Sequence, residues 1–159
     1  MYKHAGVYRI CLLCAMATTL LACGKAEVTP EQEIRALVRE AEIAAEERQV
    51  GDLARLISEQ YYDRQGNDKE TLMRMLRLQM IRNQAIYLLV QSGDISVREN
   101  NSATATVRVA MAGGPLAGLE DLPRLGAELY RFDLELAKEA GKWRIVSASW
   151  RQALTKEFH

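Results

Sequence analysis

The spacing of apolar residues changes once along this chain, and this change constrains the fold more than any other feature of the sequence. Before Asn83, apolar residues recur every three or four positions, which is the spacing of a helix face. After Asn83, apolar and polar residues alternate, which is typical of strands with one buried face. Helices followed by a run of antiparallel strands predict an α+β domain, with the helices packed on one face of a curved sheet.

Two helix starts are visible in the first part of the chain. Thr29 is expected to cap the first helix, with Pro30 in its first turn and Gln32 completing a capping box. Asn67 and Glu70 form a second capping box, which opens another helix after a shorter one. The spacing therefore predicts three helices before the sheet.

Four strands are expected in the second part. The first covers residues 86–97, with a bulge at Gly93, and the second covers residues 103–111. The third alternates over residues 130–136, and a turn at a glycine leads back into the fourth, residues 143–150.

Residues 113–126 connect two strands and carry a leucine at every third position from 116 to 125. One interpretation is a flap over a cavity or a contact surface. The other is a loop with a single helical turn that the leucines attach to the core. The second is favoured, because packed loops are common and exposed leucine patches are not.

The N-terminus has a basic start at Lys3 and Arg9, followed by an apolar run over residues 10–22. This run is shorter than the roughly 20 residues that a membrane-spanning helix needs, and the pattern is typical of an export signal. Leu20-Leu21-Ala22-Cys23 resembles the lipobox of bacterial lipoproteins. The resemblance implies a signal peptide of residues 1–22 and lipidation of Cys23. The lipidated cysteine and a short tether after it make up residues 23–29. It also implies a lipid anchor in the cell envelope, and Gly24 favours the outer membrane, with the domain facing the periplasm.

Loss of residues 1–22 would remove two cysteines, and Cys23 would be consumed by lipid, so the exported domain would have no thiol. Its one remaining histidine would be His159. We therefore expect no metal site, no cofactor and no histidine-dependent triad. Two of the 21 basic residues and none of the 21 acidic residues would be lost, which leaves a slight negative charge. Nucleic acid is therefore not an expected partner.

Three passages resemble the NTF2-like superfamily, whose cone fold is shared by ketosteroid isomerase and SnoaL-type cyclases. They are GDLARLISEQYYDRQG, RNQAIYLLV and ELYRFDLELAKEAGKWRIVSASW. The resemblance covers residues 30–153 and leaves residues 154–159 as a C-terminal tail. It implies an apolar cavity between helices and sheet. The candidate ligand-binding walls of this cavity are Tyr62, Met80, Tyr87, Phe132 and Trp150.

The same resemblance implies a catalytic alternative. Ketosteroid isomerases place a catalytic aspartate in an Asp-x-x-Gly passage, which Asp63 matches, and a protonated aspartate on the penultimate strand, near Asp133. However, Asp133 alternates with Arg131 and Glu135, as on a solvated strand face. We therefore expect the two aspartates to lie in different environments, neither strongly desolvated, and replacement of either by asparagine to leave stability nearly unchanged.

Together these features predict a membrane-anchored envelope lipoprotein with a non-catalytic NTF2-like domain that binds a ligand or another protein. The alternative is an isomerase-like or dehydratase-like enzyme that uses Asp63 as its general base. The expected partners are the membrane, through the lipid anchor, and either a small apolar ligand or an envelope protein. A homodimer through the exposed sheet face is also expected from the resemblance.

Overall fold

The structure is a computed structural model, and it describes residues 27–83 and 85–158. The predicted signal peptide, Cys23 and His159 lie outside the described residues. Helices α2 (Pro30–Glu46), α3 (Val50–Leu56) and α4 (Lys69–Arg82) precede the sheet. The sheet consists of β1 (Tyr87–Val97), β2 (Ser102–Ala112), β3 (Glu128–Glu139) and β4 (Lys142–Gln152). The predicted order of elements is confirmed.

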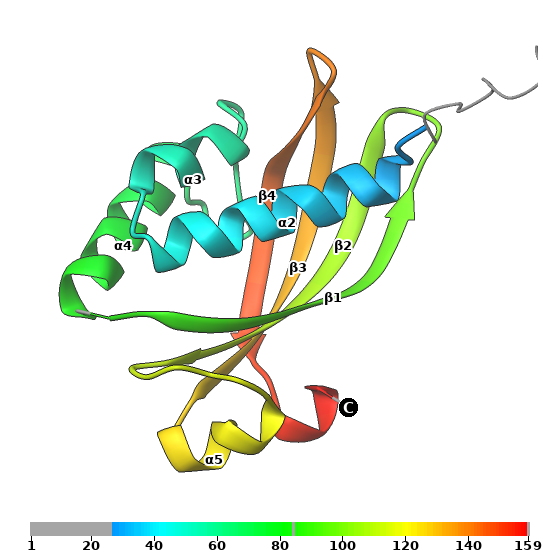
Figure 1. Cartoon of the computed structure of the whole chain (residues 1–159). Coiled ribbons are helices and arrows are strands. Elements are labelled where there is room, and N and C mark those ends of the chain that lie inside the picture. The colour runs from blue at the N-terminus through cyan, green and yellow to red at the C-terminus, as the bar shows by residue number, and fades with distance from the viewer. Residues whose placement is uncertain (1–26, 84, 159) are drawn as a thin grey trace, which may run out of the picture.

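The four strands form one antiparallel sheet in the order β1-β2-β3-β4. The register of β1 against β2 shifts between Ser92 and Ile95, which confirms the bulge expected at Gly93. The sheet is strongly twisted, and α2 crosses one of its faces (Figure 1). Helices α3 and α4 lie beside α2 (Figure 1). The predicted α+β class, with helices packed on one face of a curved sheet, is therefore confirmed.

The helix starts follow the sequence signals with one correction. Thr29 and Gln32 form the expected capping box at the start of α2. At α4, however, the N-cap is Asp68, whose side chain accepts a hydrogen bond from the backbone N–H of Thr71 at 2.8 Å. Asn67 does not cap this helix, because its side chain instead donates to Asp63 at 2.9 Å. The capping box predicted for Asn67 and Glu70 is therefore wrong by one position.

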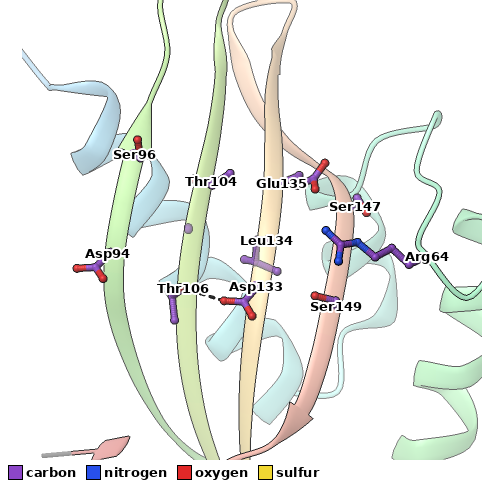
Figure 2. Close-up of a pocket in the computed structure, with 11 residues that line it drawn as sticks. Arg64, Asp94, Ser96, Thr104, Thr106, Asp133, Leu134, Glu135, Ser147 and Ser149 are labelled. Carbon is purple, nitrogen blue, oxygen red and sulfur yellow. Dashed lines mark hydrogen bonds between the residues drawn. The ribbon is translucent and has the colours of Figure 1, made fainter.

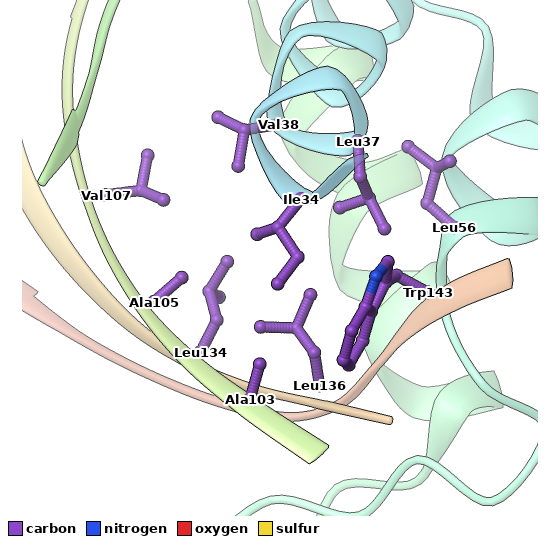
Figure 3. Packing of buried hydrophobic residues seen from close by; sticks show 10 residues of the cluster. All are labelled: Ile34, Leu37, Val38, Leu56, Ala103, Ala105, Val107, Leu134, Leu136 and Trp143. Atoms are coloured by element: carbon purple, nitrogen blue, oxygen red, sulfur yellow. The ribbon is translucent and has the colours of Figure 1, made fainter. Parts of the chain in front are cut away.

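The main core lies between α2 and the covered face of the sheet (Figure 3). Ile34 of α2 is 0% exposed and Leu136 of β3 is 1% exposed. Small residues at Ala103 and Ala105 of β2 let the helix approach the strands closely. Burial of each large side chain here contributes roughly 1.5–3 kcal/mol to stability.

A smaller core lies at the opposite face, where the leucine-rich connection packs on the end of the sheet. This connection contains a short 3₁₀ helix (Leu119–Asp121) and α5 (Leu122–Leu125). Leu122 is buried together with Ala110 of β2 and Phe158. The favoured interpretation of the connection, a loop attached to the core by its leucines, is confirmed.

The C-terminal residues are more ordered than the predicted tail. Thr155–Phe158 forms a 3₁₀ helix, and Phe158 is 4% exposed. Arg151 donates two hydrogen bonds to the carboxylate of Glu157, at 3.0 and 2.7 Å. The domain therefore extends beyond residue 153, because Phe158 is needed to cover Ala110 and Leu122.

In the described ranges of the chain, no helix is both long enough and apolar enough to span a membrane.

Candidate functional site

A cavity of about 470 Å³ lies between the helices and the covered face of the sheet. Its walls come from α2, α3, α4 and all four strands, and most of them are aliphatic or aromatic. Three of the predicted wall residues, Met80, Phe132 and Trp150, line this cavity. The rings of Phe132 and Trp150 lie side by side on β3 and β4, with centroids 6.3 Å apart. A hollow of this size and lining accommodates a small apolar molecule.

Tyr62 and Tyr87 were also predicted as walls, and neither is among the residues that line the cavity. The residues of β1 that line the cavity are Leu88 and Val90. Tyr87 points to the opposite face of the strand and is 38% exposed, because adjacent residues of a strand alternate between its two faces. Tyr62 is 64% exposed, whereas the adjacent Tyr61 is buried and lines the cavity. Of these two adjacent tyrosines, Tyr61 is therefore the one that lines the cavity.

Four polar side chains contribute to the lining: Glu42, Tyr61, Gln79 and Tyr130. The hydroxyl of Tyr61 is directed to Asp63, to which it donates at 3.4 Å. Burial, together with the charge of Asp63, raises the pKa of Tyr61 to about 12. The hydroxyl of Tyr130 donates to Glu128 at 3.0 Å. Both tyrosines are therefore neutral phenols with intramolecular acceptors.

Glu42 was not singled out from the sequence. It follows Val38 by one helical turn, so it lies on the same side of α2 as a core residue, and this spacing is the signal that could have identified it. Its burial, and then the charge of Glu46, raise the pKa of Glu42. The backbone N–H of Val90 on the edge strand β1 acts on the pKa of Glu42 in the opposite direction. One turn further along α2, Glu46 accepts a hydrogen bond from the backbone N–H of Leu88 at 2.8 Å.

Asp63 lies in the segment between α3 and α4 and is 2% exposed. One carboxylate oxygen accepts from the backbone N–H groups of Gln65 and Asn67, both at 2.9 Å. The other accepts from the Asn67 side chain at 2.9 Å and from Tyr61. Burial alone would raise the pKa of Asp63, but the bonds from Asn67 and Gln65 outweigh it and hold the pKa below its usual value. Asp63 is thus an ionised, buried acceptor, and the expectation that it is not strongly desolvated is wrong.

Asp133 lies on the open face of the sheet, in a polar groove of about 310 Å³ (Figure 2). Its carboxylate pairs with Arg131 at 2.9 Å and accepts from the Thr106 hydroxyl at 3.1 Å. The bond from Arg131 holds the pKa of Asp133 below its usual value. The rest of the groove is lined mainly by serine, threonine and acidic side chains of the strands, with Arg64 at the β4 side.

The two aspartates do not converge on a shared cavity. Asp133 is on the groove side of the sheet, and Asp63 is not among the residues that line either the groove or the apolar cavity. Both have lowered pKa values, whereas a general base is most effective when its pKa is near neutral. The geometry confirms that the aspartates lie in different environments.

Among residues 27–83 and 85–158, no group of three or more histidine, cysteine or acidic side chains is arranged to hold a metal ion.

No protein family and no curated protein matches the sequence. Similarity is found with solved structures. An NTF2-like protein of unknown function from Shewanella oneidensis MR-1 aligns with a TM-score of 0.60 and 15% identity, over 77% of this chain and 98% of that one. A putative calcium/calmodulin-dependent protein kinase type II association domain from Thiobacillus denitrificans aligns with a TM-score of 0.60 and 15% identity, over 79% and 96%.

Bd1075 from Bdellovibrio bacteriovorus aligns with a TM-score of 0.58 and 10% identity, over 77% of this chain. This chain spans only 40% of the length of Bd1075. Sequence identities this low do not carry a function from one protein to another. The structural alignments show a common architecture. The chain has an NTF2-like fold of the α+β class.

Proposed function

We propose that this protein is a lipid-anchored protein of the cell envelope whose NTF2-like domain binds a small apolar molecule without transforming it. The observation that carries the proposal is the cavity of about 470 Å³ beneath α2, with its almost entirely aliphatic and aromatic lining. Apolar area removed from water contributes roughly 25 cal/mol per Å², so a molecule that fills such a space gains substantial free energy of binding.

The arrangement of the acidic groups supports binding over catalysis. An isomerase would need a carboxylate that meets the substrate, together with a neutral donor for the developing negative charge. The oxygens of Asp63 are occupied by Asn67, Gln65 and Tyr61. The proton of Tyr61 is directed to Asp63 instead of into the cavity. This network stabilises the segment between α3 and α4.

A pair of adjacent substitutions tests the binding proposal. Ala148 lines the cavity, whereas the next residue, Ser149, lines the groove on the opposite face. Ala148→Leu should weaken binding of the neutral fluorescent probe N-phenyl-1-naphthylamine by on the order of tenfold, because the added methylene groups occupy the binding space. Ser149→Leu adds equivalent bulk and should leave the affinity unchanged. Equal affinities in all three proteins would contradict the proposal.

The lipid anchor is supported by the lipobox Leu20-Leu21-Ala22-Cys23 and by the basic and apolar segments before it. Several acyl chains, each contributing about 0.8 kcal/mol per buried CH₂ group, anchor a protein without a spanning helix. Cys23→Ser should convert the protein from a membrane-bound to a soluble or unprocessed form, measured by detergent partitioning and intact mass. Membrane fractionation like that of the wild type would exclude the anchor.

The open face of the sheet favours assembly with a second copy as a second candidate role. Strand register places Arg131 between Arg108 and Arg151, so three guanidinium groups cross the sheet in one row. Like charges placed opposite one another are unfavourable unless they are compensated. Arg131 pairs with Asp133 and Arg151 with Glu157, whereas, within the described chain, the buried Nε atom of Arg108 has no hydrogen-bond partner. The neighbouring rows carry Asp133 and Glu135, so this face offers both basic and acidic groups to a second copy.

Light scattering at increasing protein concentration tests this assembly. The mass should double with concentration, and Arg108→Glu should keep the protein monomeric while leaving its far-ultraviolet circular dichroism unchanged. A wild-type mass that stays monomeric at every concentration would exclude a dimer through this face.

A further inference from the structure

The lining of the apolar cavity is asymmetric in charge. Among the lining residues that the structure describes, Glu42 is the only ionisable side chain besides the two tyrosines, and none is a lysine or an arginine. The charge of Arg39, also on α2, acts on Glu42, but Arg39 is not one of these lining residues. A bound molecule with an anionic head would therefore meet an acidic side chain and no cation within this lining. A molecule with a cationic or hydrogen-bond-donating head would meet an acceptor.

Glu42 belongs to the solvent-exposed part of the cavity lining. It is partly exposed, and the lining residues Met75 and Gln79 of α4 are exposed. The deeper walls are buried side chains such as Leu53 and Ile57. An elongated molecule that places its apolar part against these walls would thus have its head near Glu42, where it could still contact water.

The stretch of α2 that carries Glu42 is attached to the sheet. Glu42 and Glu46 are one turn apart on α2, and Glu46 accepts a hydrogen bond from the backbone N–H of Leu88 on the edge strand β1 at 2.8 Å. A carboxylate accepts several hydrogen bonds, so Glu42 has capacity for a ligand. The partial burial that raises the pKa of Glu42 also weakens screening of its charge by solvent.

We propose that Glu42 selects the ligand of this cavity, and that the preferred class is an amphiphile with a short apolar chain and an amine or another hydrogen-bond-donating head. The inference rests on the proposed binding function and adds the chemical class of the ligand. The carboxylate of Glu42 accepts the head group, while Phe132, Trp150 and the aliphatic walls enclose the chain.

The test uses the full-length chain and three probes with the same twelve-carbon chain: dodecylamine, dodecanol and dodecanoate. Each displaces N-phenyl-1-naphthylamine below its critical micelle concentration at neutral pH. Dodecylamine should bind about tenfold more tightly than dodecanoate, with dodecanol between them, because the carboxylate of Glu42, with Glu46 one turn away, favours the cation and repels the anion.

Glu42→Gln removes the charge and keeps a polar side chain of nearly the same size at a partly exposed position, so the fold should be retained. In this variant the affinities for dodecylamine and dodecanoate should differ by no more than about twofold, while the affinity for dodecanol stays the same. The control is Glu40→Gln, which removes one negative charge from an exposed position of the same helix, away from the cavity lining, and should leave the preference intact.

Two further outcomes distinguish this inference from the proposed function. If the neutral probe and dodecanol bind but the preference is absent, or persists in Glu42→Gln, Glu42 does not select the ligand and the inference alone is overturned. If neither the neutral probe nor dodecanol binds to the wild-type protein, the binding function and the inference are both overturned.

Discussion

The two faces of the sheet use the same four strands for opposite purposes. The face under α2 is closed, and it holds the main core and the apolar cavity. The other face is open along most of its length and carries serine, threonine and charged side chains, with a small core only at one end. Adjacent residues on one strand therefore lie in unlike environments, and the effect of a substitution should depend on which face it alters.

The largest expected difference between the faces is in packing. Leu136→Ala should lower the free energy of unfolding by roughly 2–5 kcal/mol, because Leu136 is 1% exposed and its removal leaves a cavity in the main core. Glu135→Ala, one residue earlier on the open face, should change it by about 0.5 kcal/mol or less. Urea unfolding measures both, and similar losses for the two variants would show that the faces do not differ as described.

An effect of intermediate size is expected from substitution of the buried aspartate. Asp63→Asn should lower the free energy of unfolding by about 1–3 kcal/mol, because an asparagine NH₂ group would face donors that now bond to a buried carboxylate oxygen. This corrects the expectation from the sequence that the substitution has almost no effect. Urea unfolding at neutral pH measures the loss, and a stability equal to that of the wild type would show that the network contributes nothing.

The Asp63 network also predicts a pH dependence. The folded-state pKa of Asp63 is lower than the value of about 3.9 expected in an unfolded chain. Its stabilising contribution should therefore be complete above about pH 4–5, and it should be lost as the pH falls through the folded-state pKa. The stability difference between the wild type and Asp63→Asn should narrow in acid. A difference that stays constant between neutral pH and pH 3 would contradict this assignment.

The smallest effect is expected on the open face. Asp133→Asn removes an ion pair with Arg131, but the Asp133 side chain is 51% exposed. Exposed pairs contribute about 0–1 kcal/mol, and solvent screening places this one toward the lower end of that range. The loss measured by urea unfolding should be smaller than that of Asp63→Asn under the same conditions. A larger loss would show that Asp133 has a structural role that its exposure does not indicate.

Local patterns were sufficient to predict the three helices before the sheet and its four strands. The Thr29 capping box, the alternation along β3 and the bulge at Gly93 each depend on residues close in sequence, and each was predicted correctly. The cap of α4 was assigned one residue too early because two adjacent residues, Asn67 and Asp68, are both good caps. The choice between them depends on Asp63, which occupies the Asn67 side chain.

The site required tertiary structure for a similar reason. Met80, Phe132 and Trp150 were predicted correctly as cavity walls, since they are large apolar residues on inward positions. Tyr61 and Tyr62 are adjacent aromatic residues in a segment without periodicity, so only the path of the chain decides which one is buried. Glu42 resembles any polar residue of an amphipathic helix until β1 is placed beside it.

The sequence by itself determined the α+β class, the order of the elements and the division of the strands into an apolar and a polar face, because these follow from periodicity and local hydrogen bonding. The lipid anchor at Cys23 stays a prediction that rests on the sequence alone, outside the described residues. The tertiary structure decided that Asp63 is buried within a hydrogen-bond network, that Phe158 completes a second small core, and that an acidic group belongs to the solvent-exposed part of the cavity lining. These features depend on which distant segments meet, and the free energy of a buried polar group is set by those contacts and not by its neighbours in sequence.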